Sequence, residues 1–354
     1  MKKTLLSLVA AASLLLAACG GQASPNTEET AAETEQSAAT TTPAEESSAG
    51  QQPGGELDLD AQYKISIASI VSHPALDAAQ QGFIDGLAEA GLVEGKNLTL
   101  DIQNAQGDQG TLTNIANTFS QSDSQLFYAI ATPTAQALAA TITDRPIVFA
   151  AVTDPKAAGL VASWEAPDAN LTGVSDLNPM AEELALIREV LPDAKTVGIV
   201  YASGEVNSEV QVAEAEKAAG QYGFEIKTAT VTNSNEVAQA TESLDVDAYL
   251  LPTDNTVVSA VESVVQIAEQ KKVPVFSSDG GPVERGAAAG LSVNYTQQGR
   301  DAAAIALQLL AGAKPGDFPV ETQKQFDLYV NEAAAERQGI ELPQDVVDRA
   351  AKQF

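Results

Sequence analysis

The sequence predicts an α/β protein made of two similar, doubly wound parallel-sheet lobes, joined by a hinge that the chain crosses three times. Strand-like and helix-like segments alternate after residue 62, a pattern typical of parallel sheets with helices on both faces. The order of these segments repeats at an offset of roughly 120–130 residues. Three short extended segments, 171–176, 289–294 and 325–330, are the predicted crossings. The predicted lobes comprise residues 62–174 plus 294–320 and residues 175–293 plus 321–354.

The first lobe is predicted to open with a strand and a helix whose apolar residues fall on one stripe. Residues 126–130 form a buried strand that turns at once into a helix started by Pro133. Proline fits the first helical turn because its missing N–H would have no intrahelical partner there. The predicted elements of this half are strands 64–70, 97–103, 126–130 and 146–151 and helices 74–90 and 110–119.

The second half echoes the first. Pro274-Val-Phe276 repeats the strand Pro146-Ile-Val-Phe149 in nearly the same letters. A strand that starts near Asp247 runs into a helix, as residues 126–138 do. The remaining predicted elements are strands 196–201 and 224–231, a helix that ends at Gly220 and a helix over residues 256–270.

The N-terminus predicts export and a lipid anchor. Lys2 and Lys3 precede a short apolar run and the segment Leu16-Ala-Ala-Cys19, so residues 1–18 are a predicted signal peptide. The apolar run, about 12–14 residues, is too short to span a membrane. The Leu-Ala-Ala-Cys box resembles the bacterial lipoprotein signal, in which the cysteine is lipidated; an ordinary secretory signal is the alternative. Cys19 is thus the predicted lipidation site, and the protein is expected outside the cytoplasm, anchored to the bacterial cell membrane.

Residues 19–61 predict a disordered acidic tether. The segment has almost no large apolar side chains and carries acidic but no basic residues, so it cannot bury enough apolar surface to offset its ordering entropy. The whole chain has a formal net charge of −29 at pH 7. This charge argues against nucleic acid as a partner and against a polybasic contact with lipid.

The composition limits catalysis. The chain contains one histidine and one cysteine, and it lacks the patterns of zinc proteases, serine hydrolases and phosphate-binding loops. Zinc sites built from His and Cys are excluded. We therefore expect no enzyme, no metal ion and no cofactor; turnover that depends on His73 would be the sign of the opposite.

The candidate ligand-binding residues follow predicted strands at their carboxyl ends, where open α/β sheets bind ligands. The helix start at Thr132 to Thr134 suits an anion such as a carboxylate. Asp254 and Asp279, in the other half, suit a cation, so a small zwitterion is predicted between the lobes. Each of these side chains could instead simply cap the helix that follows it. The predicted ligand-binding set is Ser72, His73, Thr132, Pro133, Thr134, Thr153, Asp154, Asn207, Thr253, Asp254, Asn255, Ser278 and Asp279.

A set of short motifs carries a family resemblance. In order they are His73-Pro-Ala-Leu-Asp77, Asn104-Ala-Gln-Gly-Asp108, Ala131-Thr-Pro133, Val152-Thr-Asp-Pro155, Gly173-Val-Ser-Asp176, Pro252-Thr-Asp-Asn-Thr-Val-Val258 and Val283-Glu-Arg-Gly-Ala287. Together, over about residues 62–340, the chain resembles the ABC-transporter substrate-binding lipoproteins of the tryptophan/tyrosine type, which have the type I periplasmic-binding-protein fold. The resemblance implies a non-catalytic receptor that captures an aromatic amino acid (Trp, Tyr or Phe) and delivers it to an ABC permease in the membrane.

Two alternatives remain at this stage. The same fold could bind a nucleoside, a sugar or a branched-chain amino acid. With 5% aromatic residues and one tryptophan, a sugar is the weaker candidate, since sugar sites usually offer several stacking aromatics. A lipoprotein sensor or scaffold that contacts another protein and binds no small ligand is the alternative of a different class.

Overall fold

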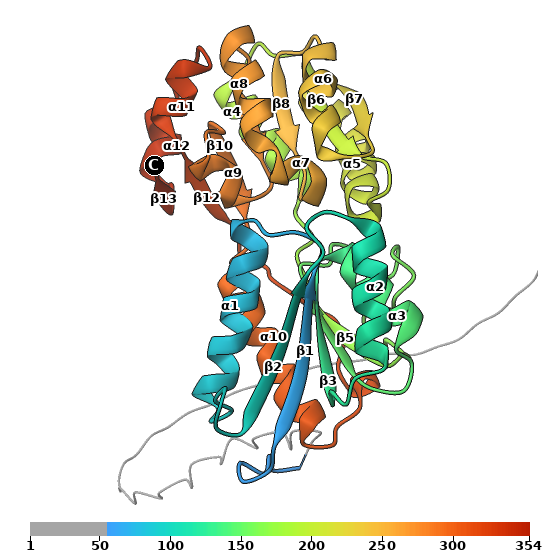
Figure 1. Ribbon diagram of the computed structural model, residues 1–354. Helices are drawn as coiled ribbons and strands as arrows, with labels where there is room; N and C mark the ends of the chain where they lie inside the picture. Colours follow the sequence, from blue (N-terminus) through green and yellow to red (C-terminus); the bar gives the residue numbers. More distant parts are fainter. Residues whose placement is uncertain (1–54) are drawn as a thin grey trace, which may run out of the picture. The chain divides into compact units, whose positions relative to one another are not determined.

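The computed structural model describes residues 55–354. The predicted signal peptide, the lipidation site Cys19 and most of the predicted tether lie outside the described residues. Residues 55–354 form two β-sheets, one with β1, β2, β3 and β5 in the lower part of Figure 1 and one with β6, β7 and β8 in the upper part. We call the six-stranded sheet with its covering helices the first lobe, and the seven-stranded sheet with its helices the second lobe. No helix within residues 55–354 has both the length and the apolar character needed to cross a membrane.

The first lobe has the strand order β11-β5-β4-β3-β1-β2, with every pair parallel. Helices α1 and α10 cover one face of this sheet, and α2 and α3 cover the other (Figure 1). The elements are β1 (Tyr63–Ser69), α1 (Pro74–Glu89), β2 (Leu98–Asn104), α2 (Gln109–Ser120), β3 (Leu126–Ile130), α3 (Thr132–Thr141), β4 (Ile147–Ala150), β5 (Leu171–Ser175), α10 (Tyr295–Leu310), η3 (Pro315–Asp317) and β11 (Glu321–Thr322).

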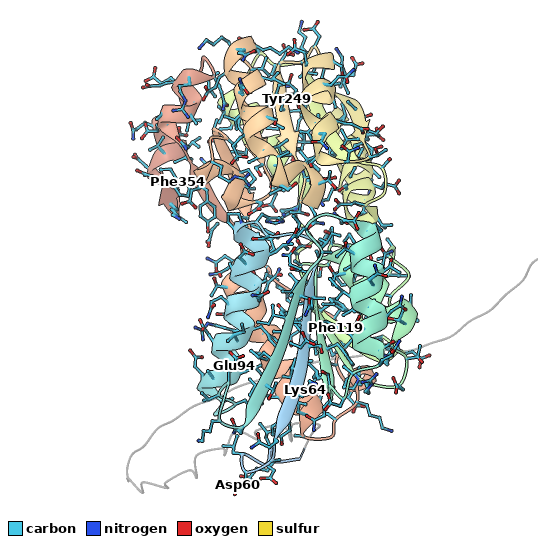
Figure 2. The ribbon with its side chains drawn as sticks, viewed as in Figure 1. Asp60, Lys64, Glu94, Phe119, Tyr249 and Phe354 are labelled. Carbon is cyan, nitrogen blue, oxygen red and sulfur yellow. The ribbon has the colours of Figure 1, made fainter. Side chains whose placement is uncertain are left out.

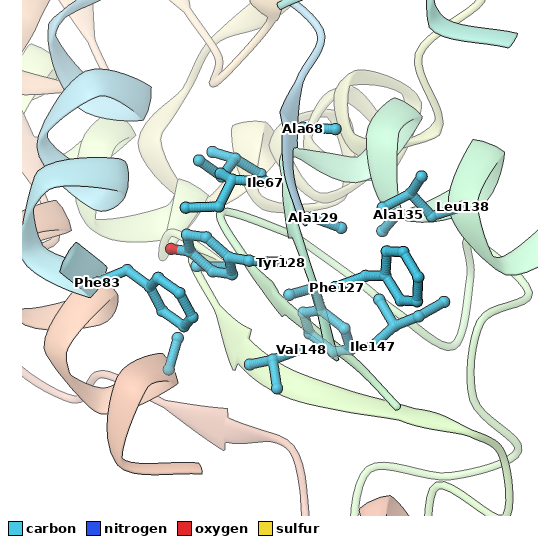
Figure 3. Close-up of a cluster of buried hydrophobic side chains, with 14 of the residues drawn as sticks. Ile67, Ala68, Phe83, Phe127, Tyr128, Ala129, Ala135, Leu138, Ile147 and Val148 are labelled. Carbon is cyan, nitrogen blue, oxygen red and sulfur yellow. The ribbon is translucent and has the colours of Figure 1, made fainter. Parts of the chain in front are cut away.

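Strand β3 runs through the core of the first lobe. All of its residues are buried, as expected for a strand covered by helices on both faces. Successive side chains point to opposite faces, so Tyr128 stacks on Phe83 of α1, with ring centroids 3.9 Å apart, while Phe127 lies toward Ala135 and Leu138 of α3 (Figure 3). The predicted strand 126–130 and the helix that follows it are confirmed.

The second lobe has the strand order β13-β12-β10-β9-β8-β6-β7, in which only the β10–β12 pair is antiparallel. Figure 2 marks Tyr249 in this sheet and Phe119 in the first lobe, both fully buried aromatic residues. The elements are α4 (Met180–Val190), β6 (Thr196–Ala202), α5 (Val206–Ala219), η1 (Gly220–Tyr222), β7 (Glu225–Val231), η2 (Ser234–Glu236), α6 (Val237–Ser243), β8 (Ala248–Leu251), α7 (Asn255–Ser259), α8 (Val261–Lys271), β9 (Val275–Ser277), α9 (Gly280–Glu284), β10 (Ala289–Ser292), β12 (Asp327–Val330), α11 (Glu332–Arg337), α12 (Gln344–Asp348) and β13 (Lys352–Gln353).

The segments predicted as crossings are mostly strands. β5, β10 and β12 are hydrogen-bonded members of the sheets, and the chain passes between the lobes only at residues 176–179, 293–294 and 323–326, which we call the three crossings. Strand β11 pairs with β5 of the first lobe, so residues 321–322 do not belong with the second lobe as predicted. β5 and β10 were misread because each is short and has a glycine among its few apolar residues.

The single helix predicted over residues 256–270 is two helices, α7 and α8, which meet at Ala260. The guanidinium of Arg285 donates to the carbonyl of Val258 (2.8 Å) and pairs with Glu262 of α8 (2.6 Å). In a continuous helix that carbonyl would accept from the N–H of Glu262. Arg285 therefore satisfies the carbonyl that the break exposes.

The end of the predicted tether is ordered against the first lobe. Leu57 and Ala61 pack on its apolar core, and the side chain of Asn97 donates to the carbonyl of Leu59 (3.0 Å). Asp60 lies at the end of this lobe that is farthest from the second sheet (Figure 2). The prediction of disorder is wrong for residues 55–61, because Leu57 and Ala61 find an apolar surface to cover.

Glycines let α1 and α10 approach closely. A Cβ on Gly299 would lie 2.1 Å from the carbonyl oxygen of Ala79, and one on Gly82 would lie 2.1 Å from that of Thr296. Neither distance allows a methyl group, and backbone atoms cannot move aside as a flexible side chain can. This contact fixes the helix that begins at Pro74 against the helix that follows the second crossing.

We expect Gly299→Ala to lower the free energy of unfolding by about 1–3 kcal/mol, since the two helix backbones would be forced apart. Gly220→Ala is the matched control: Gly220 has helical dihedral angles and no atom within 4 Å of its Cβ position, so it should stay within about 1 kcal/mol of wild type, on the stabilising side. Urea unfolding of residues 55–354 measures both. Equal stabilities for the two variants would contradict the close packing.

Candidate ligand-binding site between the lobes

The carboxyl ends of strands in both sheets face the boundary between the lobes, and several side chains touch across it. The hydroxyls of Thr153 and Thr253 lie 3.5 Å apart, and the side-chain amide of Asn178, in the first crossing, donates to the carbonyl of Ser278 (2.6 Å). A Cβ on Gly281 would lie 3.4 Å from Pro74. The polar loops of the two lobes are therefore in contact around the site.

A small cavity of about 10 Å³, roughly the space of one water molecule, lies between these loops. It receives side chains from both lobes and from the first crossing, polar groups together with two aliphatic residues. Its lining residues are His73, Leu76, Ala151, Asp176, Thr253, Asn255, Val258, Asp279 and Tyr295.

Two carboxyl groups share this cavity. Asp176 accepts hydrogen bonds from the hydroxyls of Thr153 and Tyr295, both at 3.0 Å, and Asp279 caps α9 by accepting from the N–H of Gly281 at 3.0 Å. Both are buried, and neither forms an ion pair with another of residues 55–354. Burial raises the pKa of Asp176, and burial with the neighbouring Asp176 charge raises the pKa of Asp279 to about 6.

The start of α3 offers unsatisfied donors. The hydroxyls of Thr132 and Thr134 are fully buried and have no hydrogen-bond partner among the described residues. The preceding residue, Ala131, has φ +78°, a strained angle for alanine that surrounding structure must enforce. A helix N-terminus with free N–H groups favours an anion. The two hydroxyls are therefore free to donate to a group that enters the site.

His73 forms an uncharged part of the cavity wall. It stands at the N-cap of α1 without capping it, and its Nδ1 is buried without a partner. Burial lowers the pKa of His73 to about 4, despite an opposing hydrogen bond with Asn255. At neutral pH the imidazole is thus neutral, with one ring nitrogen able to donate and the other to accept.

Asn207 is held in the second lobe beside the cavity. Its amide nitrogen donates to Glu205 and to the carbonyl of Thr253, both at 3.0 Å, while its Oδ1 is buried and unpartnered. The same carboxylate of Glu205 accepts from the N–H of Asn255 (3.0 Å). Together with Pro133, Asn255 also lines a larger, more open cavity of about 370 Å³, which adjoins the small one.

Three predicted ligand-binding residues are placed elsewhere. The Asp254 carboxyl accepts from the N–H groups of Ala202 (2.6 Å) and Val257 (2.8 Å) and from a serine hydroxyl, inside the second lobe. Burial and the Glu205 charge raise the pKa of Asp254 to about 7. Asp154 caps the turn after it, and exposed Ser72 donates to Asp77. None of the three lines the cavity, since other hydrogen bonds already use their side chains.

Six further predicted residues are buried without lining the small cavity: Thr132, Pro133, Thr134, Thr153, Asn207 and Ser278. Thr153 donates to the lining residue Asp176. Ser278 immediately precedes the lining residue Asp279, and its carbonyl accepts from Asn178.

Sequence reasoning missed Asp176 and Tyr295. Asp176 directly follows β5, at the same sheet edge as Thr132 and Thr153, so the rule of carboxyl strand ends could have identified it. It was overlooked because residues 171–176 were interpreted as a connection. Tyr295 opens α10 after the second crossing, and no local pattern marks it.

The two-lobed arrangement, with parallel sheets whose carboxyl ends enclose a buried polar cavity, is that of a type I periplasmic binding protein. The chain matches the family described as "ABC transporter substrate binding protein" over residues 64–354, and it belongs to this family. It is therefore a binding protein and not an enzyme, and it acts outside the cytoplasm as substrate-binding proteins of ABC transporters do.

Several characterised relatives refine this assignment. A tyrosine-binding protein of Clostridioides difficile (strain R20291) is 39% identical over 277 residues, 78% of this chain and 80% of the relative. A Streptococcus pneumoniae ABC domain in complex with L-Trp is 35% identical, with a TM-score of 0.81 over 83% of this chain and all of that one. The ligand-free, open structure of a Clostridium difficile substrate-binding protein is 39% identical, with a TM-score of 0.63 over 82% of this chain and 98% of that one.

We expect Asp279 to lower the stability of the ligand-free protein as the pH rises from about 4 to about 7, against an opposite contribution from His73, whose pKa is lowered to about 4. The pKa of Asp279 is raised to about 6 in the folded state, so the folded protein holds a proton that the unfolded chain releases. The stability that this proton provides is complete below the unfolded pKa and disappears as the pH passes the folded pKa. Asp279→Asn should flatten this slope in urea unfolding; an unchanged slope would contradict the burial of an unpaired carboxyl.

Proposed function

We propose that the chain captures an aromatic α-amino acid between its lobes, with the ammonium group held by Asp176 and Asp279. The observation that carries this proposal is that two buried carboxyls share one cavity with no cationic partner among the described residues. Their mutual repulsion and desolvation are costly. A ligand ammonium between them would relieve both costs.

The start of α3 is the proposed carboxylate site. The unpartnered hydroxyls of Thr132 and Thr134 would donate to the ligand carboxylate, together with the N–H groups of the first helical turn. β3, β4 and β5 are neighbours in the sheet, so the ends of β3 and β5 stand roughly 10 Å apart. In this proposal the main-chain atoms of the amino acid would lie between the side chains at those two strand ends.

The apolar part of the ligand would contact Leu76, Val258 and the ring of Tyr295, which line the same cavity. Most ligand pockets combine an apolar wall with a few convergent polar groups. The L-Trp in the S. pneumoniae relative and the name of the tyrosine-binding relative support an aromatic side chain.

The lobes of this chain are arranged as in a ligand-bound relative. The similarity to the L-Trp complex (TM-score 0.81) exceeds that to the ligand-free, open relative (0.63), although the latter is closer in sequence. This difference supports closure as the signal. A ligand shifts the protein toward the closed state only by as much as it binds that state better.

A calorimetric and thermal-shift screen of the twenty amino acids, nucleosides and common sugars tests the proposal. We expect binding by Trp, Tyr or Phe; at one hundred times the dissociation constant the ligand adds about 2.7 kcal/mol of stability. In the same assay Asp176→Asn and Asp279→Asn should each weaken binding by about 2 kcal/mol or more, and Thr132→Val by about 1–2 kcal/mol.

The matched control for these variants is Asp154→Asn, which keeps an oxygen to cap its turn and should bind as wild type does. Loss of binding in Asp154→Asn alone, with Asp279→Asn unaffected, would reverse the assignment of the ammonium site. A shift with a nucleoside, sugar or branched-chain amino acid would keep the fold and change the cargo. No binding by any compound would favour a protein-contacting sensor or scaffold.

We also propose that Cys19 is lipidated and that the anchored protein serves an ABC importer through its permease. The Leu16-Ala-Ala-Cys19 segment supports this, and Asp60, near the start of the described residues, lies at the end of the first lobe away from the second sheet (Figure 2). Cys19→Ser should move the protein from the membrane fraction to the soluble extracytoplasmic fraction. Continued membrane association of that variant would contradict the anchor.

A further inference from the structure

A buried carboxyl group in the second lobe has no role in the site described above. Glu183, the fourth residue of α4, is completely buried, and neither of its carboxyl oxygens has a hydrogen-bond partner of ordinary geometry among the described residues. It does not line the cavity. A carboxylate in such a place would be very costly, so the residue calls for a structural explanation.

The residues around Glu183 connect the first crossing to the Ser278–Asp279 turn. The Ser278 hydroxyl and the backbone of Leu291 are close enough to lower its pKa. The sulfur of Met180, one turn earlier in α4, lies 3.9 Å from the Ser278 hydroxyl. Asn178, in the first crossing, binds the Ser278 carbonyl. Because Ser278 immediately precedes Asp279, this group of residues determines where the Asp279 carboxyl stands.

The first lobe contains a counterpart. Helix α10 follows the second crossing as α4 follows the first, and its fourth residue is Gln298. Gln298 Oε1 accepts from the N–H of Ala151, just after β4 (3.2 Å), and its Nε2 donates to the carbonyl of Ser175, at the end of β5 (3.1 Å). Helix α4 packs likewise on β9 and β10, the strands that answer β4 and β5 in the internal repeat.

We propose that the Glu183 carboxylic acid is a positioning residue for the Ser278–Asp279 turn. In this role it connects the first crossing to the ends of two strands of the second lobe. The Gln298 amide connects the second crossing to the ends of two strands of the first lobe in the same way. A protonated carboxyl matches a glutamine amide in shape, with one donor and one acceptor. Because it concerns how Asp279 is presented to the ligand, this inference rests on the proposed function.

The charge environment favours the protonated form. Burial raises the pKa of Glu183 well above its usual value, and the Glu182 charge raises it further. Among the elements packed against α4, β9 and β10 carry no charged side chain, and Asp279 directly follows β9. The titratable groups of α5 and η1 are Glu209, Glu214, Glu216, Lys217 and Tyr222. The described residues place no cation against Glu183.

Ionisation of Glu183 should therefore loosen the turn and weaken ligand binding at alkaline pH. The sign follows from linkage: a carboxyl whose folded pKa is raised stabilises the protein at low pH and loses this effect as the pH rises through the folded pKa. Asp176 and Asp279 act in the opposite direction on binding, since the ligand ammonium needs their ionised forms. Affinity is thus expected to rise and then fall with pH.

The test is the pH profile of wild type and Glu183→Gln between about pH 5 and about pH 10, measured as ligand affinity and as melting temperature without ligand. We expect Glu183→Gln to bind as wild type does at neutral pH and to keep its affinity at alkaline pH, where wild type loses at least about threefold more. Deprotonation of the ligand amine affects both proteins equally, so the difference between the two profiles isolates Glu183.

Gln298→Glu supplies the reciprocal test, since it should install a new alkaline loss of melting temperature in the first lobe. Identical alkaline profiles for wild type and Glu183→Gln, in affinity and in melting temperature, would overturn the inference while leaving the proposed function intact. If no amino acid binds wild type, the proposed function fails. The ligand-free melting profiles then still decide whether Glu183 carries a proton that holds the turn.

Discussion

The structure depends on the burial of Asp176 and Asp279 in one cavity. Taking two carboxyls out of water is unfavourable unless each is hydrogen-bonded or paired. Thr153 and Tyr295 donate hydrogen bonds to Asp176, and the N–H of Gly281 donates one to Asp279. Burial still raises the pKa of both carboxyls, so these hydrogen bonds do not fully offset the loss of water. The strands, crossings and helix starts of both lobes meet at these two incompletely paired carboxyls, and a cationic group between them would complete the pairing.

Both lobes use the same local arrangement of strand, crossing and helix next to the site. Gly173 of β5 and Gly290 of β10 each allow a close backbone approach, since a Cβ there would lie 2.1 Å and 2.0 Å from the carbonyl oxygens of Phe149 and Ser277. Each strand is then followed by a crossing and by a helix whose fourth residue ties strand ends together. What differs is the chemistry at the strand ends: the hydroxyls of Thr132 and Thr134 together with Asp176 in the first lobe, and Asp279 in the second. The repeat therefore places different polar groups on a similar frame in each lobe.

The fold and half of the site were predictable because their signals are local. The strand and helix around Thr132 to Thr134 lie next to one another in sequence, and the repeated strand words mark the two lobes. Asp254 and Asp279 are alike locally, since each follows a strand and caps a helix. They differ only through contacts such as Ala202 N–H, 52 residues from Asp254, which turn that carboxyl inward. Asp176 was not predicted as a site residue because β5, the strand before it, was not recognised. The glycine and threonine in β5 interrupt its apolar pattern.

A neutral histidine matters for how closure is coupled to the ligand. With the pKa of His73 lowered to about 4, the cavity wall offers no positive charge to Asp176 and Asp279 at neutral pH. Closing the lobes without ligand then brings two desolvated carboxyls together, whereas closing them on an ammonium pairs both. The free-energy difference between these two events is the differential affinity that a population shift requires. A charged histidine would pair with the carboxyls in the empty protein, reduce that difference and allow closure without cargo.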